Sequence, residues 1–193
     1  MPVYKSKNKG FAILIITLLL AGGTVYLAGC KPAGDKNTPP VKVVAVQPAA
    51  DAIPAPKSDR RLPDSTHVFL LDDTTKITPR NDYPVHRQIT LDGDAFFYVP
   101  AASSSLTIHT KQLTLTVMGK AAFRVTGPST QPWAEVDVIN GVVIVRKAYN
   151  SPFNKPDTLH DNQMQMLNRT IDLMEKEDFD ASALRAWSDK LPR

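Results

Sequence analysis

Short segments rich in Val, Ile, Thr and aromatic residues follow one another from Thr66 to Val145, separated by turn residues and without a helical pattern between them. Two of them, residues 106–110 and 113–117, alternate apolar and polar side chains, which is typical of strands with one buried face. About nine short strands of this kind predict an all-β domain, built as a two-layer sandwich or as a short solenoid-like β-domain.

The sequence after this β-rich region is ambiguous. Residues 163–174 carry apolar side chains at helical spacing, but residues 163–166 also alternate as a strand would. Residues 180–187 are clearer, because Asp180 can cap a helix and good helix formers follow it. We therefore expect a short C-terminal helix within a helical tail over residues 171–193.

Three glycines lie between apolar segments. Gly93, Gly119 and Gly141 fit tight turns that need unusual backbone angles. Asn140 and Gly141 also separate two β-rich runs, which is a strong hairpin signal because both central positions of such a turn need positive φ. The sequence therefore predicts a β-hairpin at this point.

An apolar run over residues 11–28 follows three lysines and ends close to the only cysteine of the chain, Cys30. A basic stretch, an apolar stretch and small residues before a cleavage point are typical of a secretory signal peptide. Leu27, Ala28, Gly29 and Cys30 resemble the lipobox of bacterial lipoproteins. The resemblance implies cleavage between Gly29 and Cys30, and lipidation of the Cys30 thiol.

Several acyl chains on Cys30 would anchor the protein stably, whereas a single chain would not. The alternative is an uncleaved single-pass helix in the inner membrane, because roughly 17–25 apolar residues span a bilayer. Gly22 and Gly23 disfavour that helix. In both cases the remainder faces the periplasm. Lys31, which replaces the aspartate that usually retains lipoproteins in the inner membrane, favours the outer membrane.

The basic character of the chain comes mainly from its targeting segment. The formal charge is +4, and Lys5, Lys7 and Lys9 contribute three of these charges, so that +1 remains after cleavage. No nucleic-acid partner is expected, because such binding needs a clustered basic face. With Cys30 lipidated, no thiol remains for a disulfide. Many prolines over residues 31–63 predict a disordered, extended tether.

The β-rich segments together resemble the periplasmic FecR domain. Residues 87–99 match its first motif at Arg87, Leu91, Gly93, Asp94, Ala95, Phe97 and Val99, with Asp94 in place of a glutamate. Residues 115–125 match the second motif at Gly119, Phe123 and Val125, with Lys120 where threonine is usual, and residues 136–145 match the third around Gly141. We expect these motif residues to be structural, with Leu91, Phe97, Val99, Val117, Phe123 and Val125 on the buried face.

This resemblance, which covers about residues 66–169, completes the division of the chain. We expect a signal peptide over residues 1–29, then the lipidated cysteine and proline-rich tether over 30–64. A FecR-like β-domain over 65–170 and the helical tail follow.

Members of the FecR family are typically single-span regulators. A cytoplasmic region binds an extracytoplasmic-function sigma factor, and the periplasmic domain receives a signal from a TonB-dependent receptor, often one for iron chelates. About ten residues precede the apolar run here, and the family's usual additional module after the C-terminal tryptophan is not seen. Direct sigma-factor control by this chain is therefore not expected.

No pattern in the sequence points to catalysis, a metal site or a cofactor. The four histidines lack metal-ligand spacing, and no Gly-x-Ser-x-Gly elbow is present. Asp72 with Asp73, and Asp92 with Asp94, are close enough to bind Ca²⁺, although acids at such positions usually form turns.

Aromatic side chains offer a further candidate for binding. Phe96 and Tyr98 lie on the strand face opposite Phe97 and form either a binding patch or a covered surface.

The leading hypothesis is a non-enzymatic envelope lipoprotein whose FecR-like domain acts as a periplasmic interaction or signalling module. Its expected partners are the membrane, through the lipid, and a TonB-dependent receptor or a full-length FecR regulator. The alternatives are a structural or glycan-binding lipoprotein, a single-span FecR-like regulator and a small envelope hydrolase.

Overall fold

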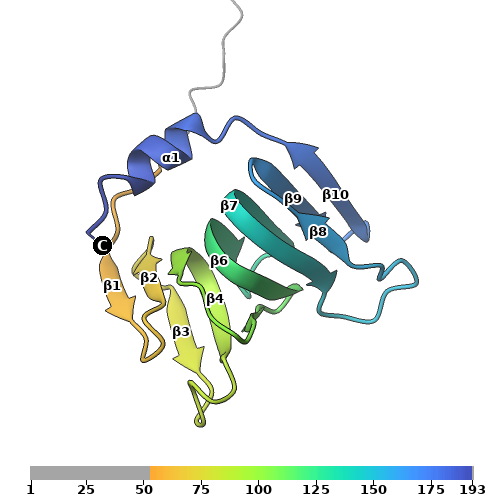
Figure 1. The fold of residues 1–193 in the computed structure, drawn as a ribbon. Coiled ribbons are helices and arrows are strands. Elements are labelled where there is room, and N and C mark those ends of the chain that lie inside the picture. Colours follow the sequence, from red (N-terminus) through yellow and green to blue (C-terminus); the bar gives the residue numbers. More distant parts are fainter. Residues whose placement is uncertain (1–52, 193) are drawn as a thin grey trace, which may run out of the picture. The chain divides into compact units, whose positions relative to one another are not determined.

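The computed structural model describes residues 53–192, so the signal peptide, the lipobox residues 27–30 and most of the predicted tether lie outside the described part. Within that part, no helix is long and apolar enough to cross a membrane. The described residues form a β-rich domain with one short helix near the C-terminus, as the sequence predicts (Figure 1).

The strands form one mixed sheet that contains ten strands among the described residues. They are β1 (Ser58–Arg61), β2 (His67–Leu70), β3 (Lys76–Pro79), β4 (Gln88–Val99), β5 (Leu106–His109), β6 (Leu113–Gly127), β7 (Trp133–Lys147), β8 (Asp157–Leu159), β9 (Gln163–Asn168) and β10 (Leu173–Asp178). The helix α1 (Ser182–Ser188) follows β10. All pairings are antiparallel except that of β4 with β5.

Three long strands, β4, β6 and β7, are shared between two halves of this sheet. In the first half-sheet the order is β3, the start of β4, β5, the start of β6, the end of β7, and β8. In the second half-sheet it is β1, β2, the end of β4, the end of β6, the start of β7, β9 and β10. The layers therefore arise from one continuous sheet rather than from two separate ones.

Each long strand contains one of the glycines at which the sequence predicts a turn. Gly93, Gly119 and Gly141 have φ angles of +123°, +73° and +107°, so the unusual backbone angles are present. The turns are not, because β4, β6 and β7 continue through these residues. The hairpin predicted at Asn140 and Gly141 is therefore wrong, and the pairing of β6 with β7 is irregular between Met118 and Ala122 instead.

Both half-sheets contribute to one hydrophobic core. Its members include Leu91 and Leu115 from the first half-sheet, and Phe97 and Phe123 from the second, whose rings stack 5.2 Å apart. The six side chains expected on the buried face are all at most 2% exposed. Strict alternation along β4 and β6 places these side chains on the inner face and leaves polar residues outside.

A second apolar cluster lies on the outer face, where α1 packs against the sheet. Phe96 is completely buried there, with its ring 5.3 Å from that of Trp187. Leu184 of α1 belongs to the same cluster, and Tyr98 packs against it. Phe96 is therefore covered, whereas Tyr98 is only half-buried.

Two of the predicted boundaries shift. Residues 58–61, assigned to the tether, form β1 and pair with β2. The tail over residues 171–193 begins with a strand, β10, and is helical only from Ser182 to Ser188. Asp180 accepts a hydrogen bond from the Ser182 amide at 2.9 Å, but the residue at the helix cap is Ala181.

Candidate functional site: a cationic cleft beside the C-terminal helix

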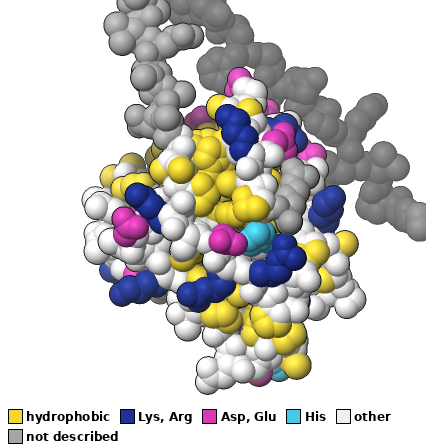
Figure 2. All heavy atoms as spheres, turned by 90° about the vertical axis from the view of Figure 1, so that its left-hand side faces the viewer, with side chains coloured by type: hydrophobic (Ala, Val, Ile, Leu, Met, Phe, Trp, Pro, Cys, Tyr) yellow, Lys and Arg dark blue, Asp and Glu magenta, His cyan; other side chains and the backbone are white. Residues whose placement is uncertain are grey.

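A cleft of about 390 Å³ lies where α1 meets the bent part of the sheet. Its walls come from the β1–β2 connection, the end of β4, the bends of β6 and β7, and the C-terminal end of α1. Figure 2 shows hydrophobic side chains gathered on the face that carries β1, with Lys and Arg side chains around them. Tyr98, Pro100 and Ala122 line the cleft and are partly exposed, with buried Val99, Ala121 and Ile139 beside them.

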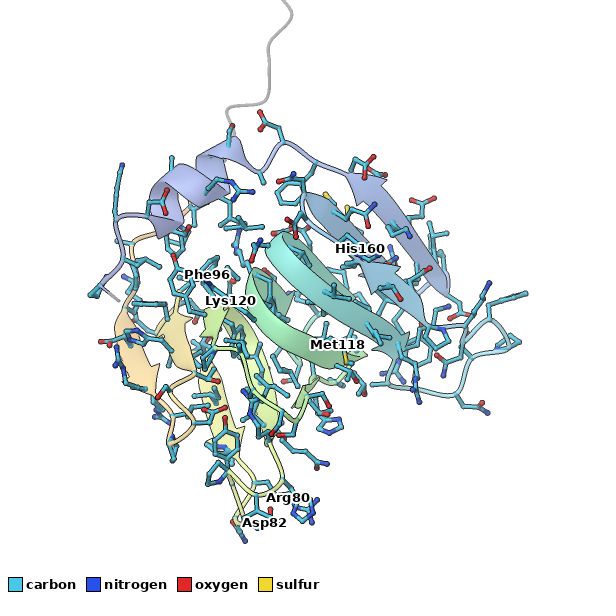
Figure 3. All side chains as sticks on the ribbon, in the orientation of Figure 1. Arg80, Asp82, Phe96, Met118, Lys120 and His160 are labelled. Atoms are coloured by element: carbon cyan, nitrogen blue, oxygen red, sulfur yellow. The ribbon has the colours of Figure 1, made fainter. Side chains whose placement is uncertain are left out.

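Three cationic side chains line this cleft from separate parts of the chain. Arg61 ends β1, Lys120 lies in the bend of β6, and Arg185 lies on α1. Arg185 donates to the Ile139 carbonyl at 2.9 Å and to Asn162 Oδ1 at 3.0 Å. Within residues 53–192, no ion pair joins any of the three to a carboxylate. Figure 3 labels Lys120 on β6.

His67 contributes a polar position on the wall of the cleft. Its side chain is only 9% exposed, and Nε2 donates to Asp59 Oδ2 at 2.8 Å. Nδ1 is buried and has no hydrogen-bond partner among the described residues. Since buried polar atoms usually have partners, this nitrogen marks a place where a bound molecule or a water would complete a bond.

Helix α1 is held beside the cleft by polar contacts as well as by apolar packing. The Tyr98 hydroxyl donates to the Ser188 carbonyl at 2.8 Å, which ties the end of the helix to β4. The Trp187 indole donates to the Pro54 carbonyl at 3.1 Å, so the start of the described chain is tied to the helix too. The walls of the cleft are therefore joined to one another.

Arg87, the first motif residue, is a buried structural clamp that does not itself line the cleft. Its side chain is 4% exposed, pairs with Asp64, and donates to the Ser104 carbonyl. Burial alone would raise the pKa of Asp64, but the nearby Tyr83 hydroxyl and hydrogen bonds from Thr66 and Arg87 lower it. The clamp joins the β1–β2 connection to the loop before β5.

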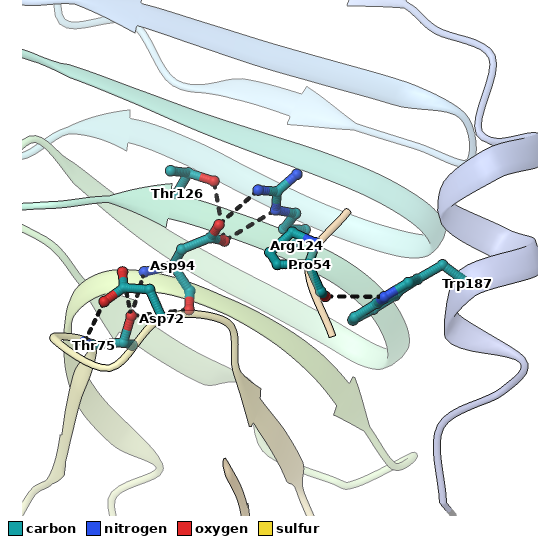
Figure 4. A network of polar contacts seen from close by, with 7 residues as sticks. All are labelled: Pro54, Asp72, Thr75, Asp94, Arg124, Thr126 and Trp187. Carbon is teal, nitrogen blue, oxygen red and sulfur yellow. Dashed lines mark hydrogen bonds and ion pairs between the residues drawn. The ribbon is translucent and has the colours of Figure 1, made fainter. Parts of the chain in front are cut away.

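Asp94, the acidic motif residue, is the centre of a network on the outer face (Figure 4). Arg124 donates to both of its carboxylate oxygens, at 3.0 Å and 2.6 Å, and Thr126 donates to one of them. The backbone of Asp94 also exchanges hydrogen bonds with the Thr75 hydroxyl, which in turn donates to Asp72. The network fixes the loop before β3 on the sheet.

Asp72, Asp92 and Asp94, three of the four candidate calcium carboxylates, are engaged by protein donors, and Asp73 pairs with Lys57 at 3.8 Å. Asp72 accepts hydrogen bonds from Thr74 and Thr75, and its pKa lies below its ordinary value chiefly because of the Thr74 hydroxyl. Asp92 accepts from the amide and hydroxyl of Ser129, which lower its pKa as well. Among residues 53–192, no three His, Cys, Asp or Glu side chains are grouped to hold a metal ion.

Next to the Asp94 network lies a carboxyl group with an unusual environment. Asp137, on β7, is 6% exposed, and burial raises its pKa to about 7, helped by the negative charge of Glu135. Arg124 opposes this shift, because its positive charge favours the ionised form. Glu135 lies two residues before Asp137 on β7 and therefore on the same strand face, whereas Arg124 and Asp94 come from β6 and β4 and leave no local signal in the sequence.

A patch of exposed apolar side chains occupies the far end of the second half-sheet. Trp133, Met166, Ile171 and Leu173 are 41%, 51%, 65% and 42% exposed. They line a shallow hollow together with Glu135 and Glu175 of β7 and β10. We name these four apolar residues the β10 patch.

Sequence reasoning did not find the cleft. Arg61, Lys120 and Arg185 are far apart in the chain, and each by itself is an ordinary surface cation. The only local signal was Lys120 at a motif position where threonine is usual. The cleft is instead assembled by the sheet bends and by the return of α1 onto β4.

Comparisons with known proteins give a likeness in structure. No family model matches the chain, and no curated protein matches it. Two crystal structures of a candidate anti-sigma factor from Parabacteroides distasonis are similar, each with a TM-score of 0.58. They are 26% and 25% identical to this chain over 69% of its length. The match spans 60% of that protein, which is less than two thirds of it.

Proposed function

We propose that this chain is a non-enzymatic interaction and signalling module of the bacterial envelope, held at the membrane by a lipid on Cys30. The observation that carries the proposal is the fold shared with a candidate anti-sigma factor at 26% identity. The order of the FecR-like motifs in the sequence supports it independently. Because the match spans 60% of that protein, the role in sigma-factor regulation and any link to iron uptake are part of the proposal.

The roles of the motif residues support a module that works by contact rather than by turnover. Arg87 and Asp94 form structural networks, and the glycines permit the strand bends. The β10 patch is a surface through which such a module can engage a protein, because exposed apolar patches commonly mark interaction sites. We propose as partner a TonB-dependent receptor or a full-length FecR regulator.

The anchor is tested by intact mass and fatty-acid labelling of the full chain beside a Cys30→Ala variant. Lipidation predicts an acylated mature chain that starts at Cys30, and a variant that is neither labelled nor cleaved. A chain that keeps Met1 and carries no lipid would contradict the lipoprotein and support the single-span alternative.

The regulatory role is tested with a photo-cross-linking residue at Ile171, in cells grown with and without iron limitation. We expect cross-links to a receptor or a regulator from Ile171 but not from Val85, an apolar residue outside the patch that is even more exposed. In the same strains, deletion of the gene should change the transcript levels of a sigma-factor regulon. Cross-links to murein-bound proteins only, with unchanged transcripts, would support the structural alternative instead.

A further inference from the structure

The cleft beside α1 combines features that a purely structural gap between a helix and a sheet does not need. Arg61, Lys120 and Arg185 line one hollow of about 390 Å³ without an ion-pairing carboxylate among residues 53–192. Like charges that share a hollow repel one another, and the repulsion is relieved when an anion binds between them.

The apolar wall limits what this anion can be. Tyr98, Pro100 and Ala122 line the cleft and are partly exposed, so that an apolar group placed against them removes apolar surface from water. The volume lies within the range of roughly 300–1,000 Å³ that is typical of small-molecule pockets. An inorganic anion alone would leave this wall uncovered, so an apolar body must accompany the charge.

Nδ1 of His67, buried without a hydrogen-bond partner among residues 53–192, offers one further polar position on the wall.

We propose that this cleft binds a small organic carboxylate, with its apolar body against Tyr98, Pro100 and Ala122 and its carboxylate between the cations. Arg61 and Lys120 bind the charge, while Arg185 lines the α1 side. The cleft is thus a ligand site of the domain that is separate from the β10 patch.

The position of the site couples the ligand to the helix. Its walls come both from β4, β6 and β7 and from α1, so a bound ligand contacts the helix and the sheet together. A ligand that binds only the folded arrangement stabilises it by mass action. Occupancy therefore holds α1 on the outer cluster formed around Phe96.

The test compares three probes that share one apolar body and differ in charge. They are 3-phenylpropanoate, its neutral amide and the corresponding amine, each titrated into the full-length isotope-labelled chain in a non-ionic detergent. We expect saturable NMR shifts at the amides of Ala121, Ala122 and Ser188 with the carboxylate. The amide should bind about ten-fold more weakly, and the amine should show no saturable shift.

Variants of exposed cations separate a site from general attraction. Lys120→Gln and Arg61→Gln should each weaken carboxylate binding about three-fold to ten-fold, and high salt should do the same. Lys155→Gln, an exposed lysine that does not line the cleft, is the matched control and should leave the affinity unchanged. The proposal would be overturned if the carboxylate and the amide bound with equal affinity, or if Lys120→Gln and Lys155→Gln had equal effects. NMR shifts outside the cleft would overturn it as well. Since binding is measured on purified protein, the result does not depend on the regulatory role.

Discussion

At the scale of single residues, the outer face of the second half-sheet carries charges that act as a group. Arg124 lies among Asp94, Asp137 and Glu135, and the charges of all three raise its pKa although burial lowers it. Asp94 holds the guanidinium with two hydrogen bonds, whereas Asp137 is left buried beside the like charge of Glu135. The single positive charge of Arg124 therefore lies opposite the acidic side chains of Asp94, Asp137 and Glu135.

Asp137→Asn should stabilise the protein at alkaline pH. In the folded protein the pKa of Asp137 is about 7, above its ordinary value of 3.8. Below about pH 4 the carboxyl group is protonated in both the folded and the unfolded protein and does not lower the free energy of unfolding. As the pH rises to about 7, the buried group resists ionisation and the free energy of unfolding of the wild type falls. The variant should be roughly 1–3 kcal/mol more stable than the wild type at pH 8, with no gain at pH 4. Urea unfolding at the two pH values measures this, and a gain of equal size at both would contradict it.

Arg124→Gln should have the opposite effect. It removes the ion pair with Asp94 and leaves three acids close together, which should cost about 2 kcal/mol at pH 7 and less at pH 4. Arg146→Gln, a change at an exposed arginine on the same strand as Asp137, is the control and should cost less than about 0.5 kcal/mol. A similar loss in both variants would show that the network contributes little.

At the scale of elements, the bends of β4, β6 and β7 allow one sheet to supply both layers. A residue with positive φ inside a strand turns the chain without ending its pairing, and glycine does this at the lowest cost. Crowding differs between the bends: a Cβ at Gly141 would lie 2.6 Å from the Lys120 carbonyl oxygen, whereas a Cβ at Gly119 would meet nothing within 4 Å.

Gly141→Ala and Gly119→Ala should therefore differ in their effect on stability. Gly119→Ala should lower the stability by about 1 kcal/mol, because the only strain comes from a side chain at a φ of +73°. Gly141→Ala adds a clash with backbone atoms to a φ of +107°, and should cost more than about 3 kcal/mol. Denaturant unfolding of both variants checks this, and an equal cost would mean that the bends of β6 and β7 yield to accommodate a side chain.

At the scale of the whole described domain, α1 packs on the outer face of the sheet and forms a second hydrophobic core with it. It buries Phe96 and ties β4 to the residues before β1, through Ser188 and Trp187. The same placement creates the cationic cleft, because the end of the helix supplies one of its walls. Stability and the proposed ligand site thus depend on one element.

Trp187→Ala should loosen this element selectively. Loss of the ring contact with Phe96 and of the hydrogen bond to Pro54 should cost about 2–3 kcal/mol. Trp133→Ala, at a tryptophan that is 41% exposed, should cost less than about 1 kcal/mol. Hydrogen exchange should show faster exchange in α1 with β6 and β7 still protected. Faster exchange throughout the sheet would mean that α1 and the sheet unfold as one unit.

The sequence alone determined the fold class and the inner face of the strands. Alternation along residues 113–117 and the motif positions of Phe97 and Phe123 identified core residues, because side chains of a strand point to opposite faces whatever the strand pairs with. The helix formers after Asp180 likewise predicted a short helix. These features depend on local periodicity and local preference, which the sequence displays directly.

Only the tertiary structure decided what the glycines do, what covers Phe96, and which cations meet. A positive φ at Gly141 suits both a hairpin and a bend within a strand, so the local signal cannot distinguish them. An outward aromatic side chain is exposed or buried according to a helix much later in the chain. Arg61, Lys120 and Arg185 share a cleft because of long-range pairing and packing, which leave no periodic pattern in the sequence.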